Sequence, residues 1–137
     1  MITKTKICGI TTTEDYIVCR DAGAAFVGMV HYPGSSRHLS LGTLSKLAAC
    51  SAATDPHAPD RVLLSVDVPV EDLSALIEAG NPDLLQLHGN ETPEYVATIK
   101  TRFGLPKKGP CWNVLPQKRM YFLQSSSQHL HGFQKAQ

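Results

Sequence analysis

Short apolar runs alternate with helix-like segments over the first three quarters of the chain, and this alternation is the strongest constraint on its fold. The runs cover residues 4–10, 24–30, 61–68 and 84–88. Near-continuous apolar strands separated by helices indicate a parallel sheet that is buried on both faces. The pattern therefore predicts an α/β fold of about four βα units with right-handed connections.

The first helix is expected over residues 13–21. Thr12 has the hydroxyl that caps a helix start, and Gly23 follows the end of the segment. The apolar pattern places Ile17 and Val18 on the buried side of this helix.

The other three helix starts are as distinct as the first. Ser40 is expected to cap a helix that runs to about Cys50, and residues 70–79 form the third amphipathic segment. The clearest signal is Thr92 followed by Pro93, because a capping hydroxyl and a proline at the first helical position are both typical of a helix N-terminus.

Composition changes abruptly after Pro106. Residues 1–106 hold eight Lys and Arg against twelve Asp and Glu, whereas residues 107–137 hold five Lys and Arg and no acid. Five of the six glutamines also lie in the second segment. We therefore divide the chain into a regular unit, 1–106, and a divergent tail, 107–137, which we expect to be irregular or translated out of frame.

Charge and cysteine usage exclude several classes of function. The acidic unit gives no reason to expect nucleic-acid binding, and no apolar run is long enough for a membrane span, so no membrane association is expected. The chain also shows no secretory leader, so we expect a cytoplasmic protein. Its four cysteines have no spacing suited to zinc or to a disulfide framework, which predicts reduced thiols and no metal site.

Two side chains stand at strand ends where parallel α/β proteins place their chemistry. Cys8 lies at the expected tip of the first strand, on the same face as Lys6, and can be a reactive thiol or a buried structural one. Arg37 lies in the polar loop after the second run and can clamp a carboxylate or simply be solvated.

Further polar residues end the third and fourth runs. Gln86 and His88 share one face, so they can contact a ligand or hydrogen-bond within the core. Asp67 can orient a substrate or cap the helix near Val70, and we favour capping. His31 ends the second run and is left without a role.

Four motifs in one order and at βα spacing carry a family resemblance. They are Lys6-Ile-Cys-Gly-Ile-Thr11, Gly23-Ala-Ala-Phe-Val-Gly-Met-Val30, Ser36-Arg-His38 and Gln86-Leu-His-Gly89. Over residues 4–106 the chain resembles the phosphoribosylanthranilate isomerases of tryptophan biosynthesis. The resemblance implies a partial (β/α)8 TIM barrel of about four βα units followed by a non-homologous tail.

The resemblance also implies a reaction and its residues. The family converts N-(5-phosphoribosyl)anthranilate into 1-(2-carboxyphenylamino)-1-deoxyribulose 5-phosphate, an Amadori rearrangement of an aldose to a ketose that needs no metal or organic cofactor. Cys8 would be the general base and Arg37 would bind the anthranilate carboxylate, with Gln86 and His88 close to the substrate. Ser36 departs from the family, which usually has proline there.

Two hypotheses remain open, because the family's general acid and its phosphate-binding loops lie in the second half of the barrel. No residue after Pro106 matches either. The first hypothesis is the isomerase, acting on a phosphorylated small molecule. The alternative is a truncated, non-catalytic half-barrel that self-associates through its open sheet edges. A small α/β domain for another phosphate ligand is disfavoured, because no glycine-rich phosphate loop follows the first strand.

Overall fold

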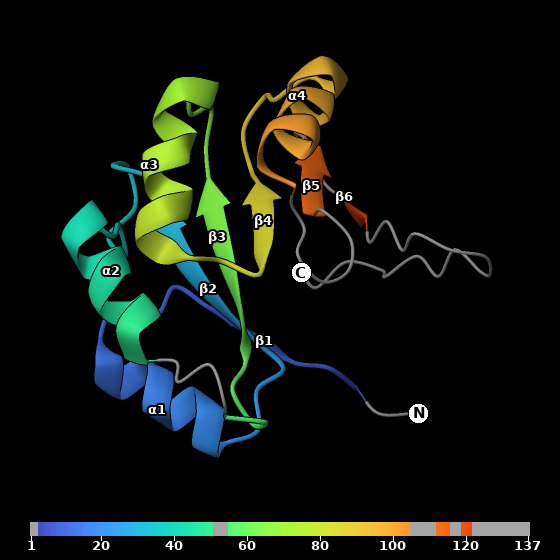
Figure 1. The fold of residues 1–137 in the computed structure, drawn as a ribbon. Coiled ribbons are helices and arrows are strands. Elements are labelled where there is room, and N and C mark those ends of the chain that lie inside the picture. Colours follow the sequence, from blue (N-terminus) through green and yellow to red (C-terminus); the bar gives the residue numbers. More distant parts are fainter. Residues whose placement is uncertain (1–2, 51–54, 105–111, 116–118, 122–137) are drawn as a thin grey trace.

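The computed structural model describes residues 3–50, 55–104, 112–115 and 119–121. Strands and helices alternate through the first 104 residues, as the sequence predicts (Figure 1). The elements are β1 (Lys6–Cys8), α1 (Thr13–Asp21), β2 (Phe26–His31), α2 (Leu41–Cys50), β3 (Asp60–Ser65), α3 (Val70–Gly80), β4 (Leu84–Leu87), α4 (Pro93–Phe103), β5 (Trp112–Leu115) and β6 (Arg119–Tyr121).

The strands form one sheet in sequence order, β1 to β6. Strands β1 to β5 are parallel to their neighbours, and β6 returns antiparallel to β5. Sequential parallel strands joined by helices are the repeating unit of a (β/α) barrel. The predicted four βα units are therefore confirmed.

Two short strands lie in the segment that the sequence predicts to be irregular. Residues 112–115 pair parallel with β4, where Gln86 lies opposite Trp112, and residues 119–121 pair with β5. Their sequences, Trp-Asn-Val-Leu and Arg-Met-Tyr, contain the aromatic and β-branched residues that strands favour. The edge of β4 pairs with β5, and β5 in turn pairs with β6. The other tail residues, including Cys111, lie outside the described part of the chain.

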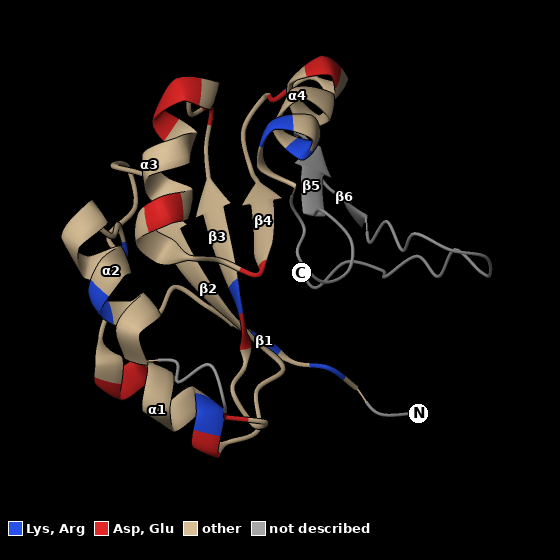
Figure 2. Ribbon diagram, viewed as in Figure 1, with Lys and Arg blue, Asp and Glu red and all other residues tan. Residues whose placement is uncertain are grey.

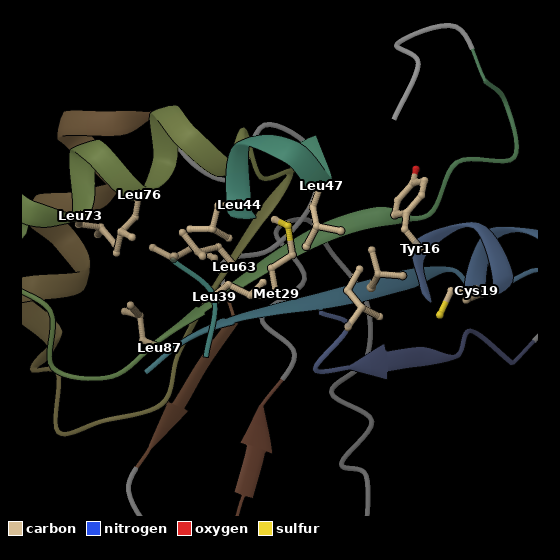
Figure 3. Close-up of a cluster of buried hydrophobic side chains, with 14 of the residues drawn as sticks. Tyr16, Cys19, Met29, Leu39, Leu44, Leu47, Leu63, Leu73, Leu76 and Leu87 are labelled. Atoms are coloured by element: carbon tan, nitrogen blue, oxygen red, sulfur yellow. The ribbon is translucent and has the colours of Figure 1, made fainter. Parts of the chain in front are cut away.

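All four helices contribute to one core on a single face of the sheet. Figure 3 shows the leucines of α2 and α3 against Met29 and Leu63 of the strands, with Tyr16 and Cys19 of α1 at the far end. Ile99 of α4 belongs to the same cluster. A parallel sheet with its helices on one face is a barrel wall rather than a doubly wound sheet, which has helices on both faces.

The opposite, inner face of the sheet carries its own apolar group. Val62 and Leu84 are buried there, and Phe26 packs against them. Alternation along the strands places Lys6, Cys8 and Gln86 on this same face, away from the helices. Figure 2 shows that charged residues gather mainly on the helices and at the strand ends, and Lys6 is the first residue of β1.

The predicted helix caps are confirmed. Thr12 accepts a hydrogen bond from the Asp15 N–H at 3.1 Å, and the Asp15 carboxylate accepts one from the Thr12 N–H, which completes a capping box. Ser40 accepts from the Thr43 N–H, and Thr92 accepts from the Tyr95 N–H. These local bonds fix where each helix begins.

The predicted buried side of α1 is wrong. Ile17 and Val18 are 43% and 67% exposed, whereas Tyr16 and Cys19 face the core. Residues three apart share a helix face, and the pair Tyr16 and Cys19 occupies the face that meets the sheet.

Within the described residues, no helix is both long enough and apolar enough to cross a membrane.

We expect Leu63→Ala to lower the free energy of unfolding by about 2–5 kcal/mol, because it leaves a cavity among fully buried side chains. Val18→Ala is the matched control and should change it by less than about 0.5 kcal/mol. Urea unfolding followed by circular dichroism measures both values. Equal losses from the two variants would contradict this assignment of core and surface.

Candidate active site

Cys8 lies at the carboxyl end of β1, where the pairing with β2 places it opposite Gly28. A Cβ added to Gly28 would come within 2.7 Å of the Cys8 sulfur, so only glycine leaves room for this thiol. The chain turns immediately afterwards at Gly9, whose φ of +84° is unfavourable for other residues. Cys8 is exposed, which excludes the buried structural thiol that the sequence left open.

The Lys6 side chain contacts both Cys8 on its own strand and a residue of β4. The Lys6 ammonium donates to the Cys8 sulfur at 3.6 Å and also to the side-chain oxygen of Gln86 in β4. Burial lowers the pKa of Lys6 from its ordinary value, and the charge and hydrogen bond of Cys8 oppose that shift. The site therefore holds a half-buried cation against its only described exposed thiol.

Arg37 comes to the same place from the loop after β2. Its guanidinium donates to the Cys8 carbonyl oxygen at 3.3 Å, and its side chain occupies the space beside Gly9. The Arg37 N–H is held by the Ser35 hydroxyl at 3.1 Å. A guanidinium has five N–H donors, so the bond to Cys8 leaves others that can bind an anion.

Gln86 and His88 differ in accessibility although they share a strand face. Gln86 is 5% exposed and is held by Lys6, whereas His88 is exposed just beyond β4. The His88 N–H donates to the Ser65 carbonyl, which extends the pairing of β4 with β3 by one bond. Contact of these two residues with a substrate stays a prediction.

The family model for N-(5'phosphoribosyl)anthranilate (PRA) isomerase matches residues 5–111. The chain belongs to this family. The match ends five residues beyond the boundary at Pro106 that composition indicates, and it confirms the resemblance carried by the four motifs.

Relatives in the phosphoribosylanthranilate isomerase family match about the same part of this chain as the family model does. The N-(5'-phosphoribosyl)anthranilate isomerase of Cereibacter sphaeroides is 44% identical over 103 residues, which cover 75% of this chain and 47% of that protein. The Nitrobacter winogradskyi isomerase is 45% identical over 101 residues, 74% of this chain and 43% of that protein. The chain thus spans about half the length of the curated relatives it matches.

Solved isomerases share the fold. The crystal structure from Thermus thermophilus superposes with a TM-score of 0.70 at 27% identity and covers 85% of this chain and 54% of that one. A second isomerase, solved in complex with reduced 1-(o-carboxyphenylamino)-1-deoxyribulose 5-phosphate, gives a TM-score of 0.66 at 31% identity, over 74% of this chain and 50% of that one. The α/β fold with partial barrel architecture is therefore shown.

Asp67 does not cap α3, so the prediction of a capping role is wrong. The N-cap of α3 is Pro69, without a side-chain bond, and Asp67 itself has a positive φ of 49°. Its carboxylate accepts from the Asn90 N–H at 2.6 Å instead, in the loop after β4. The turn at Asp67 points the carboxylate to the neighbouring loop rather than along its own helix.

Glu91 is a rim residue that sequence reasoning missed. It is 8% exposed, and its two carboxylate oxygens accept from the N–H groups of Asp67 and Gly89 at 2.9 and 2.8 Å. With the bond from Asn90 to Asp67, it fastens the loop after β3 to the loop after β4. The only signal in the sequence is an acid next to the cap Thr92, which is too common to single out.

Two histidines support the loop that holds Arg37. The rings of His31 and His38 lie 4.7 Å apart, and the His31 Nδ1 is 2.9 Å from the Leu39 carbonyl oxygen.

Among the described residues no group of three or more His, Cys, Asp or Glu side chains could hold a metal ion. Cys19 and Cys50 are unpaired thiols like Cys8.

A surface hollow lies at the opposite end of the strands. Arg20, Asp55 and His57 line it, close to where β2 and β3 begin. Active sites of (β/α) barrels sit at the carboxyl ends of the strands. The Cys8 end, and not this hollow, is therefore the candidate active site.

Tyr95 gives the rim a pH dependence that can be measured. Its hydroxyl donates to the Val68 carbonyl oxygen at 2.5 Å, and burial, followed by Glu91, Glu71 and Asp67, raises its pKa to about 12. The unfolded chain releases this proton near pH 10, so the stabilising effect is complete below pH 10 and is lost as pH rises toward 12.

We expect Tyr95→Phe to lower the free energy of unfolding by about 1 kcal/mol at pH 7, the value of one hydrogen bond. Urea titrations at pH 7 and at intervals from about pH 10 to 12 should show the difference between wild type and variant shrinking in the alkaline range. If the difference in unfolding free energy between wild type and variant does not change with pH, the pKa of Tyr95 is not raised by folding.

Proposed function

We propose that this chain supplies the base-bearing half of a phosphoribosylanthranilate isomerase site. The reaction is the conversion of N-(5-phosphoribosyl)anthranilate to 1-(2-carboxyphenylamino)-1-deoxyribulose 5-phosphate, an intramolecular oxidoreduction of an aldose to a ketose. The observation that carries the proposal is an exposed thiol at the end of β1, flanked by the Lys6 ammonium and the Arg37 guanidinium. The solved relative that holds a reduced product analogue supports this substrate class.

Cys8 is the proposed general base. After the ribose ring opens to a protonated Schiff base, the thiolate takes the proton from C2′. The C–H electron pair forms the C1′=C2′ double bond, and the electron pair of the C1′=N double bond moves onto the nitrogen, which gives an enolamine. Loss of the proton from the C2′ hydroxyl and addition of a proton at C1′ then convert the enol to the ketone, which completes the change from aldose to ketose. A thiolate suits this step where positive charge stabilises it at neutral pH, and Lys6 and Arg37 supply positive charge beside Cys8.

Arg37 is the proposed clamp for the anthranilate carboxylate. It is exposed, and it lies on the carbonyl of the residue that carries the base, so a carboxylate bound to it would place the reacting carbon close to the thiol. His88 and Gln86 are proposed to lie close to the substrate on the β4 side. A cytoplasmic location fits this chemistry, because the base must remain a reduced thiol.

A non-catalytic, self-associating half-barrel is the second candidate. It is supported by the match to about half of each relative, by the position of β1 at the end of the described sheet, and by the exposure of Ile7, Ile17 and Val18 on β1 and α1. Apolar side chains beside a sheet edge favour association with a second copy.

The decisive test joins residues 1–104 of this chain to the second half of the Cereibacter sphaeroides isomerase. We expect this chimera to support growth of a tryptophan auxotroph that lacks the isomerase. Cys8→Ser in the chimera should lower kcat at least about 100-fold, because it removes a general base that typically supplies 10²–10⁴ in rate. Cys50→Ser, which changes a half-buried thiol on α2, is the control and should retain activity.

Growth supported equally by the chimera and its Cys8→Ser variant would eliminate Cys8 as the base. In the same background Arg37→Lys should mainly raise KM, because a point charge cannot form two parallel bonds to a carboxylate. The 137-residue chain alone should not support growth, since the family's general acid and phosphate loops belong to the second half of the barrel. Growth with that chain alone would overturn the non-catalytic alternative.

Sedimentation of the 137-residue chain tests self-association. We expect a dimer or larger species, and we expect Ile17→Lys combined with Val18→Lys to shift it toward the monomer, because both side chains are exposed and apolar. Glu14→Gln is the control: it changes the charge of an exposed residue on the same helix and removes no apolar side chain. A wild-type chain that sediments as a monomer at all concentrations would remove this candidate.

A further inference from the structure

Lys6 and Gln86 meet across the inner face of the sheet although 80 positions separate them in the sequence. Their strands, β1 and β4, are not neighbours, because β2 and β3 lie between them. The contact therefore depends on the curvature of the barrel wall and on the length of the lysine side chain. The same Lys6 ammonium also donates to the Cys8 sulfur.

We propose that Lys6, anchored by Gln86, is a positioning residue that favours the thiolate of Cys8 and fixes the direction of its sulfur. The inference rests on the proposed role of Cys8 as the base, and it assigns to Gln86 a task that needs no contact with substrate. Gln86 is 5% exposed, which fits a residue that acts through Lys6. Lys6 is half-buried and its ammonium lies 3.6 Å from the sulfur.

The charges that face Cys8 support this assignment. Lys6 lies on the same strand, Arg37 approaches from the loop after β2, and Gly28 on the paired strand presents no side chain. The Arg37 guanidinium donates to the backbone carbonyl of Cys8, whereas the Lys6 ammonium donates to the sulfur itself. A cation in direct contact with the sulfur favours the thiolate most strongly.

The identity of the anchor also matters. The Gln86 amide oxygen holds the ammonium with a neutral acceptor, so the positive charge of Lys6 still acts on the sulfur. A carboxylate in its place would hold the lysine as firmly but would cancel that charge. Burial lowers the pKa of Lys6, and the charge and hydrogen bond of Cys8 oppose that shift.

The test uses the whole 137-residue chain without substrate. The rate of alkylation of Cys8 by iodoacetamide is measured against pH, and mass spectrometry separates Cys8 from the other cysteines. Lys6→Met should raise the pH midpoint of the Cys8 reaction by about one unit, so that alkylation near neutral pH slows roughly tenfold. Lys6→Arg, which keeps the charge, should restore most of the wild-type profile.

Two further variants sharpen the result. Gln86→Glu should raise the midpoint in the same direction as Lys6→Met, although it leaves an acceptor for the lysine. Lys4→Met is the matched control. Lys4 is an exposed lysine two residues before Lys6, and its ammonium lies 6.0 Å from the Phe26 ring centre, so its loss should leave the midpoint of the Cys8 reaction unchanged.

Equal midpoints for Lys6→Met and Lys4→Met would overturn the proposal, as would an unshifted midpoint in Gln86→Glu. Circular dichroism of each variant identifies a loss of fold, and Gln86→Glu keeps the test valid if Lys6→Met unfolds. Because the readout needs no turnover, an inactive chimera with the expected alkylation shifts would contradict the proposed function alone. An active chimera without those shifts would contradict only the positioning role.

Discussion

The pairing of β1 with β2 determines the geometry of the whole candidate site. β1 has only three residues, and its described partner is β2, with Ile7 opposite Val27 and Cys8 opposite Gly28. Strand side chains alternate with a period of two, so a slip of one residue would turn Cys8 toward the helices and Ile7 toward the inner face. Backbone bonds from Gly9 and Ile10 to the Gly28 carbonyl, at 2.9 and 3.2 Å, hold the register just beyond the strand.

The site also depends on side chains that are absent. Gly28 leaves the space that the Cys8 sulfur occupies, and Gly9 leaves the space for the Arg37 side chain. An alanine at either position would displace a functional group rather than simply weaken packing. The glycines therefore act together with the register: pairing sets the direction of the thiol, and the missing Cβ atoms allow the thiol and the guanidinium to approach the same piece of backbone.

Local features of the fold could be predicted from the sequence, and long-range polar contacts could not. The helix starts at Thr12, Ser40 and Thr92 depend on bonds within four residues, so the sequence contains all the information they need. The Lys6–Gln86 bond depends on sheet curvature, and the Asp67 contact to Asn90 depends on how two loops meet. For Asp67 the sequence favours a helix cap, because a cap needs only neighbouring residues, whereas the contact to Asn90 requires two loops to meet in space.

Lys6 illustrates how a stability argument separates structural from functional residues. The inner face at this level is apolar, with Phe26 beside Val62 and Leu84, and a half-buried ammonium there loses hydration that one amide oxygen and one thiol only partly replace. An apolar side chain of similar length would fill the same space without that cost. The proposed positioning role explains why the chain keeps a cation at this cost: the ammonium touches the sulfur of Cys8, which would carry a negative charge as the proposed base.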